Sequence, residues 1–369
     1  MKISCSTQKL QKAIQMLQKA IPAKTPTPIL TGIYMEIRNQ RLELQATDYE
    51  IGIVCSIEVE AEEPGKIVVP GRTFSELVKK LPGDNVSLYT EDNGHSIHIH
   101  SDRAKFRLVG LPVEEYPVIR KLESDKKIVL PDDILRDLIK KTVYACSNDE
   151  SRPVFTGVLL EVKDNAISFV ATNTHRLALR RKELSTNENV SFIIPGKILQ
   201  ELAKNLTSDL PEEVVLSWKN KQLSFAFDDV YFETRLLEGN FPDYNRVIPS
   251  SFATRVRINK SDFLAAVERV SLLSKDGDYN IIRLQIEESE LTVSSNNPEI
   301  GNATETISCI TEGNGLEIAF NAKYVSEMLR TIEEEYMTFQ CNTPVSPACL
   351  KPASDDYYSY IVTPVRVAY

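Results

Sequence analysis

The sequence lacks the segments that would place a chain in or across a membrane. It contains no run of 18 apolar residues, and its first residues lack the basic and then apolar pattern of a secretory signal. Its six cysteines are scattered and form no Cys-x-x-Cys pair. Such cysteines are typical of reduced, packed thiols rather than of disulfides or a zinc site. We therefore expect a cytoplasmic protein with no metal site and no membrane partner.

The sequence also lacks the common catalytic and nucleotide-binding motifs, since it has no P-loop, no dinucleotide fingerprint and no Gly-x-Ser-x-Gly elbow. His95, His98 and His100 resemble a metal cluster, but on a strand only His98 and His100 share a face. Solvated strand histidines are the favoured interpretation. An enzyme that uses His175 and Asp48 is the remaining catalytic alternative, but no identifiable nucleophile accompanies them. We expect no catalytic residue and no cofactor.

One pattern is present three times, at residues 69–81, 194–206 and 320–332. In each copy a strand end leads into a short helix whose apolar residues fall at positions i, i+3, i+4 and i+7. Each copy also carries two basic residues seven positions apart, namely Arg72 and Lys79, Lys197 and Lys204, and Lys323 and Arg330. The chain therefore consists of three copies of one module.

The 369 residues divide into three domains of ordinary size, predicted at 1–124, 125–252 and 253–369. A first amphipathic helix is expected near the start of each, and strand patterns fill the rest. The strand corners also correspond, at Ala46-Thr47-Asp48, Ala171-Thr172-Asn173 and Ser295-Asn296-Asn297. Asp92-Asn93-Gly94 predicts a hairpin turn. The fold class is α+β, with antiparallel sheets and two helices in each module.

Positive charge is concentrated on the predicted helices, although the chain has a formal net charge of -9. The basic residues of the helices and their caps are Lys9, Lys12, Lys19, Arg72, Lys79, Lys80, Arg136, Lys140, Lys141, Lys197, Lys204, Lys260, Arg269, Lys323 and Arg330. A solvated face would explain any one helix. Recurrence in three modules favours a surface that faces phosphates. Without a base-reading motif, such contact is electrostatic, salt-sensitive and independent of sequence.

The tripled module resembles the bacterial sliding clamp family, the beta subunits of DNA polymerase III. Thr172-Asn173-Thr174-His175-Arg176-Leu177 is similar to the family's T-D-G-H-R-L. Further matches are 236–249, Pro28-Ile29-Leu30, Thr47-Asp48-Tyr49-Glu50, Asn296-Asn297-Pro298-Glu299 and Val362-Thr363-Pro364-Val365-Arg366. The resemblance implies a non-catalytic processivity factor, a head-to-tail homodimer that forms a six-domain ring around duplex DNA, close to the nucleoid. Twelve lining helices, each roughly 10 Å across, would span a circle wide enough for a duplex.

The resemblance also implies a peptide groove on the second and third domains. Its partners would be the DNA polymerase III catalytic subunit, the clamp loader, other polymerases and repair proteins. By motif position, the groove residues are Phe155, Thr172, Thr174, His175, Arg176, Leu177, Pro242, Arg246, Val247, Val345, Val362, Pro364, Val365 and Arg366. The chain departs from the family at Thr174, usually Gly, at Pro347, commonly Ser, and in the extension Ala368-Tyr369.

Two further surfaces are expected. The DNA-facing set comprises Lys24, Arg72, Lys79, Lys80, Arg136, Lys140, Arg152, Lys197, Lys204, Arg269, Lys323 and Arg330. Phe106, Leu108, Leu272 and Leu273 match the family's dimer interface, with internal core as the alternative. A monomeric scaffold that binds only proteins is the rival to the ring.

Overall fold

The computed structural model describes residues 1–91, 95–206, 212–274 and 280–366, which form two compact units. The first unit is Met1–Leu135 with Glu201–Leu236, and the second is Arg136–Gln200 with Leu237–Tyr369. The boundary between the units therefore runs through the central module. The predicted hairpin turn at Asp92-Asn93-Gly94 and the extension Ala368-Tyr369 lie outside the described residues.

The first unit contains two antiparallel sheets. The smaller has the order β5-β1-β7-β8-β9, with β5 Glu60–Glu63, β1 Lys2–Ser6, β7 Asn85–Glu91, β8 Ser96–Ser101 and β9 Ala104–Val109. The larger has the order β10-β15-β16-β17-β4-β3-β2-β6, with β10 Lys127–Pro131, β15 Glu213–Lys219, β16 Gln222–Phe227, β17 Val230–Arg235, β4 Ile51–Glu58, β3 Arg41–Thr47, β2 Gly32–Arg38 and β6 Lys66–Pro70. Pairing of β17 with β4 joins strands of the first and central modules in one sheet.

The second unit contains one sheet of twelve strands, in the order β14-β11-β12-β13-β25-β24-β23-β18-β21-β20-β19-β22. Its strands are β14 Val190–Pro195, β11 Gly157–Lys163, β12 Ala166–Thr172, β13 Arg176–Glu183, β25 Tyr358–Val362, β24 Ala348–Pro352, β23 Tyr336–Cys341, β18 Thr254–Asn259, β21 Gly301–Gly313, β20 Glu290–Asn297, β19 Ile281–Ile286 and β22 Leu316–Asn321. Here β13 of the central module pairs with β25 of the last module.

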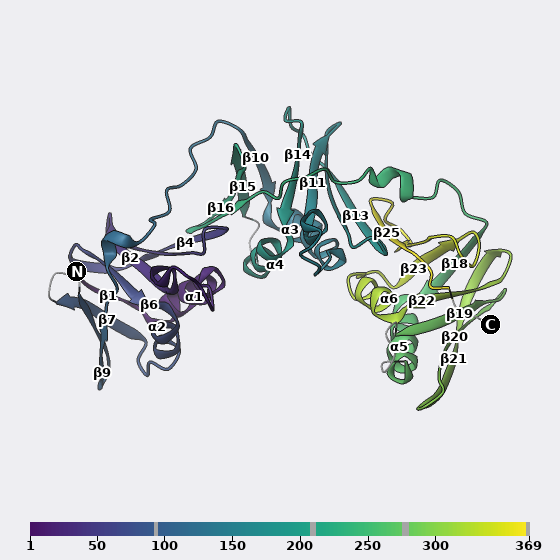
Figure 1. Cartoon of the computed structure of the whole chain (residues 1–369), viewed down its shortest axis with the longest axis horizontal. Coiled ribbons are helices and arrows are strands. Elements are labelled where there is room, and N and C mark those ends of the chain that lie inside the picture. The colour runs from purple at the N-terminus through teal and green to yellow at the C-terminus, as the bar shows by residue number, and fades with distance from the viewer. Residues whose placement is uncertain (92–94, 207–211, 275–279, 367–369) are drawn as a thin grey trace. The chain divides into compact units, whose positions relative to one another are not determined.

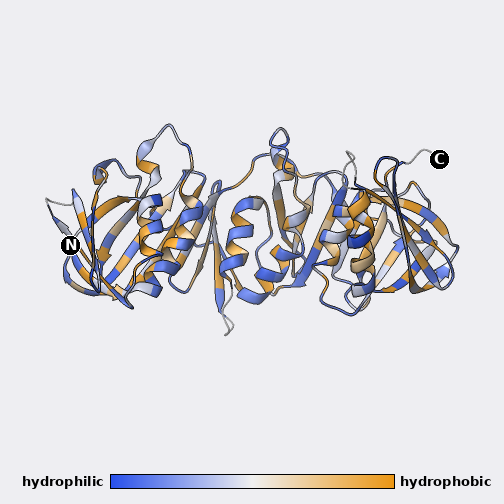
Figure 2. Cartoon of the chain, turned by 90° about the horizontal axis from the view of Figure 1, so that it is seen from below, coloured by the Kyte–Doolittle hydropathy of each residue, from blue (hydrophilic) through white to orange (hydrophobic). Residues whose placement is uncertain are grey.

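Helices cover the sheets, as the repeat predicts. They are α1 Thr7–Leu17, α2 Gly71–Val78, α3 Asp132–Lys140, α4 Gly196–Asn205, α5 Lys260–Val270 and α6 Ala322–Leu329. Within the first unit α1 packs against α2, and within the second α5 packs against α6 (Figure 1). Hydrophilic and hydrophobic residues alternate along the helices (Figure 2), so each helix keeps a polar stripe.

The α2 helix shows how the repeat pattern produces this layer. Phe74 and Val78 are buried, because residues four apart share a helix face, while Arg72 lies exposed on another face. Asn259 and Asn321 cap α5 and α6, and each side-chain oxygen accepts backbone N–H groups of the first turn. The predicted helices are confirmed, with short 3-10 turns continuing α1 and α5.

The three strand corners correspond as the sequence predicts. Thr47 and Thr172 end their strands, and each hydroxyl accepts the N–H two residues on. At the next position of each corner, a side-chain oxygen of Asp48, Asn173 or Asn297 accepts the N–H two residues on. Asn297 is therefore the counterpart of Asp48 and Asn173, and Asn296, which lies within β20 opposite Asn302, is the counterpart of Thr47.

Candidate peptide groove and nucleic-acid interface

The corner between β12 and β13 is held by its own side chains. The Thr172 hydroxyl donates to the carbonyl of Arg176 at 2.6 Å and accepts the N–H of Thr174 at 3.1 Å. Asn173 Oδ1 accepts the N–H groups of His175 and Arg176, both at 3.1 Å. Thr174 has a φ of +76°, in the left-handed region. The local bonds therefore fix the backbone that presents Arg176 and Leu177.

An apolar cavity of about 270 Å³ lies beside this corner in the second unit. It is lined by Phe155, Thr172, Thr174, Arg176, Leu177, Phe241, Pro242, Asp243, Tyr244, Val247, Pro347, Ile361 and Thr363. Seven of these were predicted from the sequence as groove residues: Phe155, Thr172, Thr174, Arg176, Leu177, Pro242 and Val247. Pro347, where the resemblance noted a departure from Ser, is part of the lining. The cavity has the size and apolar lining needed for one or two side chains of a bound peptide.

The other predicted groove residues lie outside the lining of this cavity. His175 is exposed and borders a neighbouring polar cavity of about 430 Å³. Arg246 is exposed, and its Nε is 3.0 Å from an oxygen of Asp243. Val345 is 64% exposed, whereas Val362 is fully buried. Pro364, Val365 and Arg366 follow β25, and the N–H of Val365 donates to the carbonyl of Ala319 at 2.8 Å.

Six lining residues were not predicted, and two signals could have found most of them. Phe241, Asp243 and Tyr244 surround Pro242 in a motif that the sequence already singles out. Phe241 packs edge-on against Phe155, with ring centroids 6.4 Å apart. Ile361 and Thr363 alternate with Val362 along the strand direction, so they lie on the face opposite to it.

Arg176 is the cationic group of the cavity wall, and it is nearly fully buried. Its Nη1 donates to the carboxylate of Glu327 on α6, and its Nη2 donates to the carbonyl of Tyr144. The guanidinium lies 4.5 Å from the ring centroid of Tyr324 and 5.5 Å from that of Tyr144. Burial lowers the pKa of Arg176, but Tyr360 and Glu327 outweigh it, and the pKa stays above its ordinary value. Arg176 is therefore always charged.

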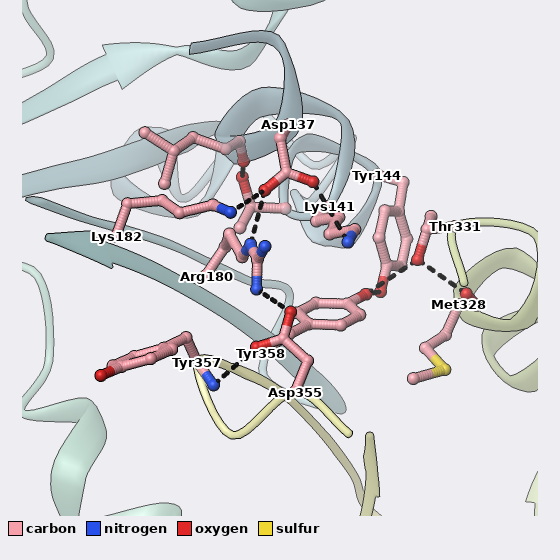
Figure 3. Close-up of polar contacts among 12 residues, drawn as sticks. Asp137, Lys141, Tyr144, Arg180, Lys182, Met328, Thr331, Asp355, Tyr357 and Tyr358 are labelled. Carbon is pink, nitrogen blue, oxygen red and sulfur yellow. Dashed lines mark hydrogen bonds and ion pairs between the residues drawn. The ribbon is translucent and has the colours of Figure 1, made fainter. Parts of the chain in front are cut away.

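A second buried cation, Arg180 of β13, joins three elements of the second unit (Figure 3). Its Nε donates to Asp137 of α3 at 2.6 Å, and its Nη1 donates to Asp355, in the turn before β25. Lys141 and Lys182 also lie near Asp137, with N–O distances of 3.1 and 3.6 Å. Burial raises the pKa of Asp137, but Arg180 and Lys141 overcome that effect and hold the pKa below its usual range. Two carboxylates thus hold three cations where the central and last modules meet.

A chain of hydroxyl groups continues this junction. The Thr331 hydroxyl donates to the carbonyl of Met328 at 2.8 Å, so its oxygen accepts from Tyr358 at 3.0 Å. The Tyr358 oxygen in turn accepts from Tyr144 at 2.8 Å. Tyr358 is fully buried and Tyr144 is half-buried, and burial raises the pKa of Tyr358 to about 12. The three hydroxyl groups of this junction therefore all have hydrogen-bond partners.

The residues predicted to face DNA are mostly on the surface. Lys24, Arg72, Lys79, Lys80, Lys140, Arg152, Lys197, Lys204, Arg269, Lys323 and Arg330 are exposed, and Arg136 is half-buried. Several form exposed ion pairs, such as Lys204 with Glu201 at 2.9 Å and Arg330 with Glu268 at 2.7 Å. Such pairs contribute about 0–1 kcal/mol, so a phosphate can replace the carboxylate at little cost. Lys141 differs from the other helix cations, because it is buried against Asp137 and Tyr358.

The residues predicted for the dimer interface lie in two places, on strand β9 and in the 3-10 turn after α5. Phe106 is 40% exposed on β9, and Leu108 on the same strand is half-buried. Leu272 is 59% exposed in the 3-10 turn after α5, and Leu273 beside it is half-buried. In the described part of the chain β9 pairs with β8 alone, which leaves one edge of the strand open.

The strand histidines have local partners. His98 Nε2 lies 3.0 Å from a carboxylate oxygen of Glu91, and its ring stacks on Tyr89 with centroids 4.6 Å apart. Among the described residues no group of three His, Cys, Asp or Glu side chains is placed to hold a metal ion. In those same ranges no helix is both long and apolar enough to cross a bilayer.

Fold and surface together define a class: a protein of three repeated α+β modules with exposed cations on its helices and an apolar cavity beside the corner of β12 and β13. The models of the DNA polymerase III beta subunit match this chain in sequence order, with the N-terminal domain at residues 1–120, the central domain at 129–243 and the C-terminal domain at 245–366. The beta sliding clamp of Staphylococcus epidermidis is 36% identical over 358 residues, covering 94% of each chain.

Solved structures agree. The DNA polymerase sliding clamp of Bacillus subtilis superposes with a TM-score of 0.94 at 34% identity, covering 100% of both chains. The sliding clamp of Pseudomonas aeruginosa bound to griselimycin has a TM-score of 0.93 at 29% identity, again over 100% of both chains. The chain belongs to the DNA polymerase III beta subunit family, the beta sliding clamps. It has the three-domain clamp fold, and its function is that of a non-catalytic sliding clamp in DNA replication.

Proposed function

We propose that two copies of the chain close head to tail into a ring around duplex DNA, with domains at 1–124, 125–252 and 253–369. The observation that carries this proposal is the recurrence of exposed cations at matching helix positions in an acidic chain. Arg72, Lys197 and Lys323 open the second helix of successive modules, and all three are exposed. None of the three belongs to a base-reading motif. Their contacts with phosphates would therefore position the ring on DNA and still allow it to slide.

Open strand edges support closure of the ring. The edge of β9 is unpaired in the described chain, and the first half of β21 pairs only with β20, since β18 meets β21 from residue 309 onward. A strand edge with free N–H and C=O groups adds readily to another edge. We propose that Phe106 and Leu108 of one copy meet Leu272 and Leu273 of the other. Head-to-tail contacts of this kind form a closed ring when the rotation returns to the start.

The apolar cavity is proposed as the attachment site for partners. Replicative and other polymerases, the clamp loader and repair proteins would each insert a short peptide whose Leu or Phe side chain enters the cavity. Burying one such side chain contributes about 1.5–3 kcal/mol. The groove set carried over from the family, including His175, Arg246, Val345, Val362, Pro364, Val365 and Arg366 at its borders, remains part of this proposal. The protein then acts in the cytoplasm, on the nucleoid.

Retention on circular DNA tests the ring. The protein, loaded on nicked circular duplex, should stay bound through gel filtration and leave when the circle is cut once, because enclosure rather than affinity holds it. Leu272→Ala with Leu273→Ala should give folded monomers that are not retained, as light scattering would show. Equal retention on circular and linear DNA, or a double variant that stays dimeric at low micromolar concentration, would refute the proposed ring.

A further inference from the structure

The position of Arg176 in the groove wall is set by groups outside its own strand. Glu327 of α6 accepts from one of its terminal nitrogens, and the Tyr144 carbonyl accepts from the other. Tyr324 and Tyr144 flank the guanidinium with their rings. Glu327 is the only acid among these groups, so it supplies the charge that balances a buried cation.

Glu327 itself has no place in the lining of either described cavity, whereas Arg176 lines both the apolar cavity of about 270 Å³ and the polar cavity of about 430 Å³. Lys323, four residues earlier on α6, lies 3.9 Å from Glu327, and it is largely exposed. An ion pair at that distance to a solvent-exposed lysine is weak. The strong interaction of Glu327 is therefore the one with Arg176.

Removal of that negative charge leaves a buried guanidinium without a counter-ion, which is unfavourable in a poorly hydrated site. The least costly response is rotation of the side chain out of the wall, and the open spaces beside it are the two cavities that Arg176 borders. In the apolar cavity the guanidinium would take up volume and place a charge against an apolar side chain of the peptide. The peptide would then bind less tightly.

We propose that Glu327 is a positioning residue for the peptide groove: by holding the Arg176 guanidinium in the wall, it keeps the apolar cavity open for the partner's side chain. This rests on the proposed use of the cavity as a peptide site. Glu327 acts through Arg176 and touches no part of the peptide. The groove thus depends on a residue of the third domain that also forms part of a helix proposed to face DNA.

A double-mutant cycle tests the proposal on the full-length chain. The probe is a fluorescent peptide containing Leu and Phe, taken from the polymerase III catalytic subunit, with griselimycin as a competitor. Glu327→Gln keeps the shape of the side chain and removes its charge, and it should weaken peptide binding about tenfold. In the background Arg176→Met, which has no buried cation to position, Glu327→Gln should change the dissociation constant less than twofold. If Glu327→Gln alone is unstable, the comparison of Arg176→Met with and without Glu327→Gln can still be measured.

Two controls separate this proposal from the location of the groove. Glu268→Gln removes the acid of another Glu–Arg pair, with Arg330, and should leave peptide affinity unchanged. Val247→Asp places a charge in the cavity wall and should abolish binding. Wild-type affinity in Val247→Asp would overturn the peptide groove itself. Loss of binding in Val247→Asp, with wild-type affinity in folded Glu327→Gln or an equal loss in both Arg176 backgrounds, would overturn only the role of Glu327.

Discussion

Thr174 occupies a backbone conformation that its side chain disfavours. Its φ of +76° is in the left-handed region, where a β-branched residue is strained. The side chains of Thr172 and Asn173 accept hydrogen bonds from the N–H groups of Thr174 and His175, and these bonds hold the corner in place. Tyr49 has a φ of +73° at the equivalent corner of the first domain, so the conformation belongs to the repeated corner rather than to the threonine. The family's usual Gly fits this position without strain.

Replacing Thr174 by Gly should raise the free energy of unfolding by about 0.5–1 kcal/mol, because relief of strain exceeds the extra entropy of Gly in the unfolded chain. Urea unfolding measures the change. The matched control is Thr304→Gly on the exposed face of β21, where φ is negative, and it should lower the same free energy by about 0.5–1 kcal/mol. A less stable Thr174→Gly variant would show that the hydroxyl or methyl group contributes more than the strain costs.

Buried thiols give a second prediction at this scale. Burial raises the pKa of Cys5, Cys55 and Cys146 to about 12, and that of Cys341 and Cys349 to about 11. A rise from 9.0 to about 12 lowers the thiolate fraction at pH 8 about a thousandfold. The folded protein should therefore react slowly with a disulfide reagent at pH 8, and all six thiols should react quickly in guanidinium. Rapid titration of several thiols without denaturant would contradict this burial.

The residues predicted from the sequence include only part of the lining of the apolar cavity, for a physical reason visible at single residues. A motif match points to Val362, but alternation along a strand turns its neighbours Ile361 and Thr363 to the opposite face, and these two line the cavity. Which face of a strand is open to a ligand depends on what packs against it from elsewhere in the chain. The pattern of residues along one strand therefore does not predict which of its faces will line a cavity.

At the scale of elements, the amphipathic helices were predicted well and the opening strand of each module was missed. β1, β10 and β18 are five or six residues long and run directly into α1, α3 and α5. Their alternating burial is clear in the structure, but it spans too few residues to separate from the helix start. Each is stabilised by partners far along the chain, as in the pairing of Lys2 with Tyr89 and of Lys127 with Ser217.

The charged junction of α3, β13 and the turn before β25 should make the second unit acid-sensitive. Asp137 has a lowered pKa in the folded state, so its ion pairs stabilise the protein above the carboxyl's ordinary pKa, near 3.8. That stabilisation is lost as the pH falls through the lower, folded pKa. Asp137→Asn should reduce stability at pH 7 by about 3–5 kcal/mol, since Arg180 then lacks one carboxylate.

Thermal unfolding from pH 7 to pH 3 provides the measurement. The wild-type melting temperature should fall toward pH 3 more steeply than that of Asp137→Asn, so that the two curves converge at acid pH. Asp133→Asn, an exposed residue at the start of the same helix, is the matched control and should follow the wild type. Parallel curves for Asp137→Asn and the wild type would remove Asp137 as a source of acid sensitivity.

For the whole molecule, the repeat predicted three modules but not the joining of their sheets. β17 pairs with β4, and β13 with β25, across 175 or more residues of sequence, as in the pairing of Val230 with Cys55. A strand edge has no sequence signature that names its partner. The pairing is fixed only when the modules have folded and present edges of matching length and polarity.

Neutralising four cations tests the DNA-facing surface of the whole chain. Changing Arg72, Lys79, Lys197 and Lys204 to Gln should weaken DNA binding and flatten the slope of log K against log salt by about 0.9 for each phosphate that the protein no longer neutralises. Lys66, Lys127, Lys163 and Lys219, all exposed on strands, supply a control with the same change in charge. If the helix and strand variants gave equal slopes, net charge rather than the helices would govern binding.

The segment from Phe241 to Ile248 follows the last strand of the central module and forms one wall of the apolar cavity. Phe241, Tyr244 and Ile248 pack on the buried cluster that contains Leu177 and Ile361. In the corresponding segment of the first domain the tyrosine packs inward: Tyr116 is buried, and its hydroxyl donates to the carbonyl of Gln45 at 3.1 Å. During evolution the side chains of the segment from Phe241 to Ile248 can change as the binding partners change, but the number of residues in the segment is expected to stay the same. An inserted residue would be selected against for two reasons. It would disturb the packing of the segment on the buried cluster, and it would change the cavity wall that is proposed to bind partners.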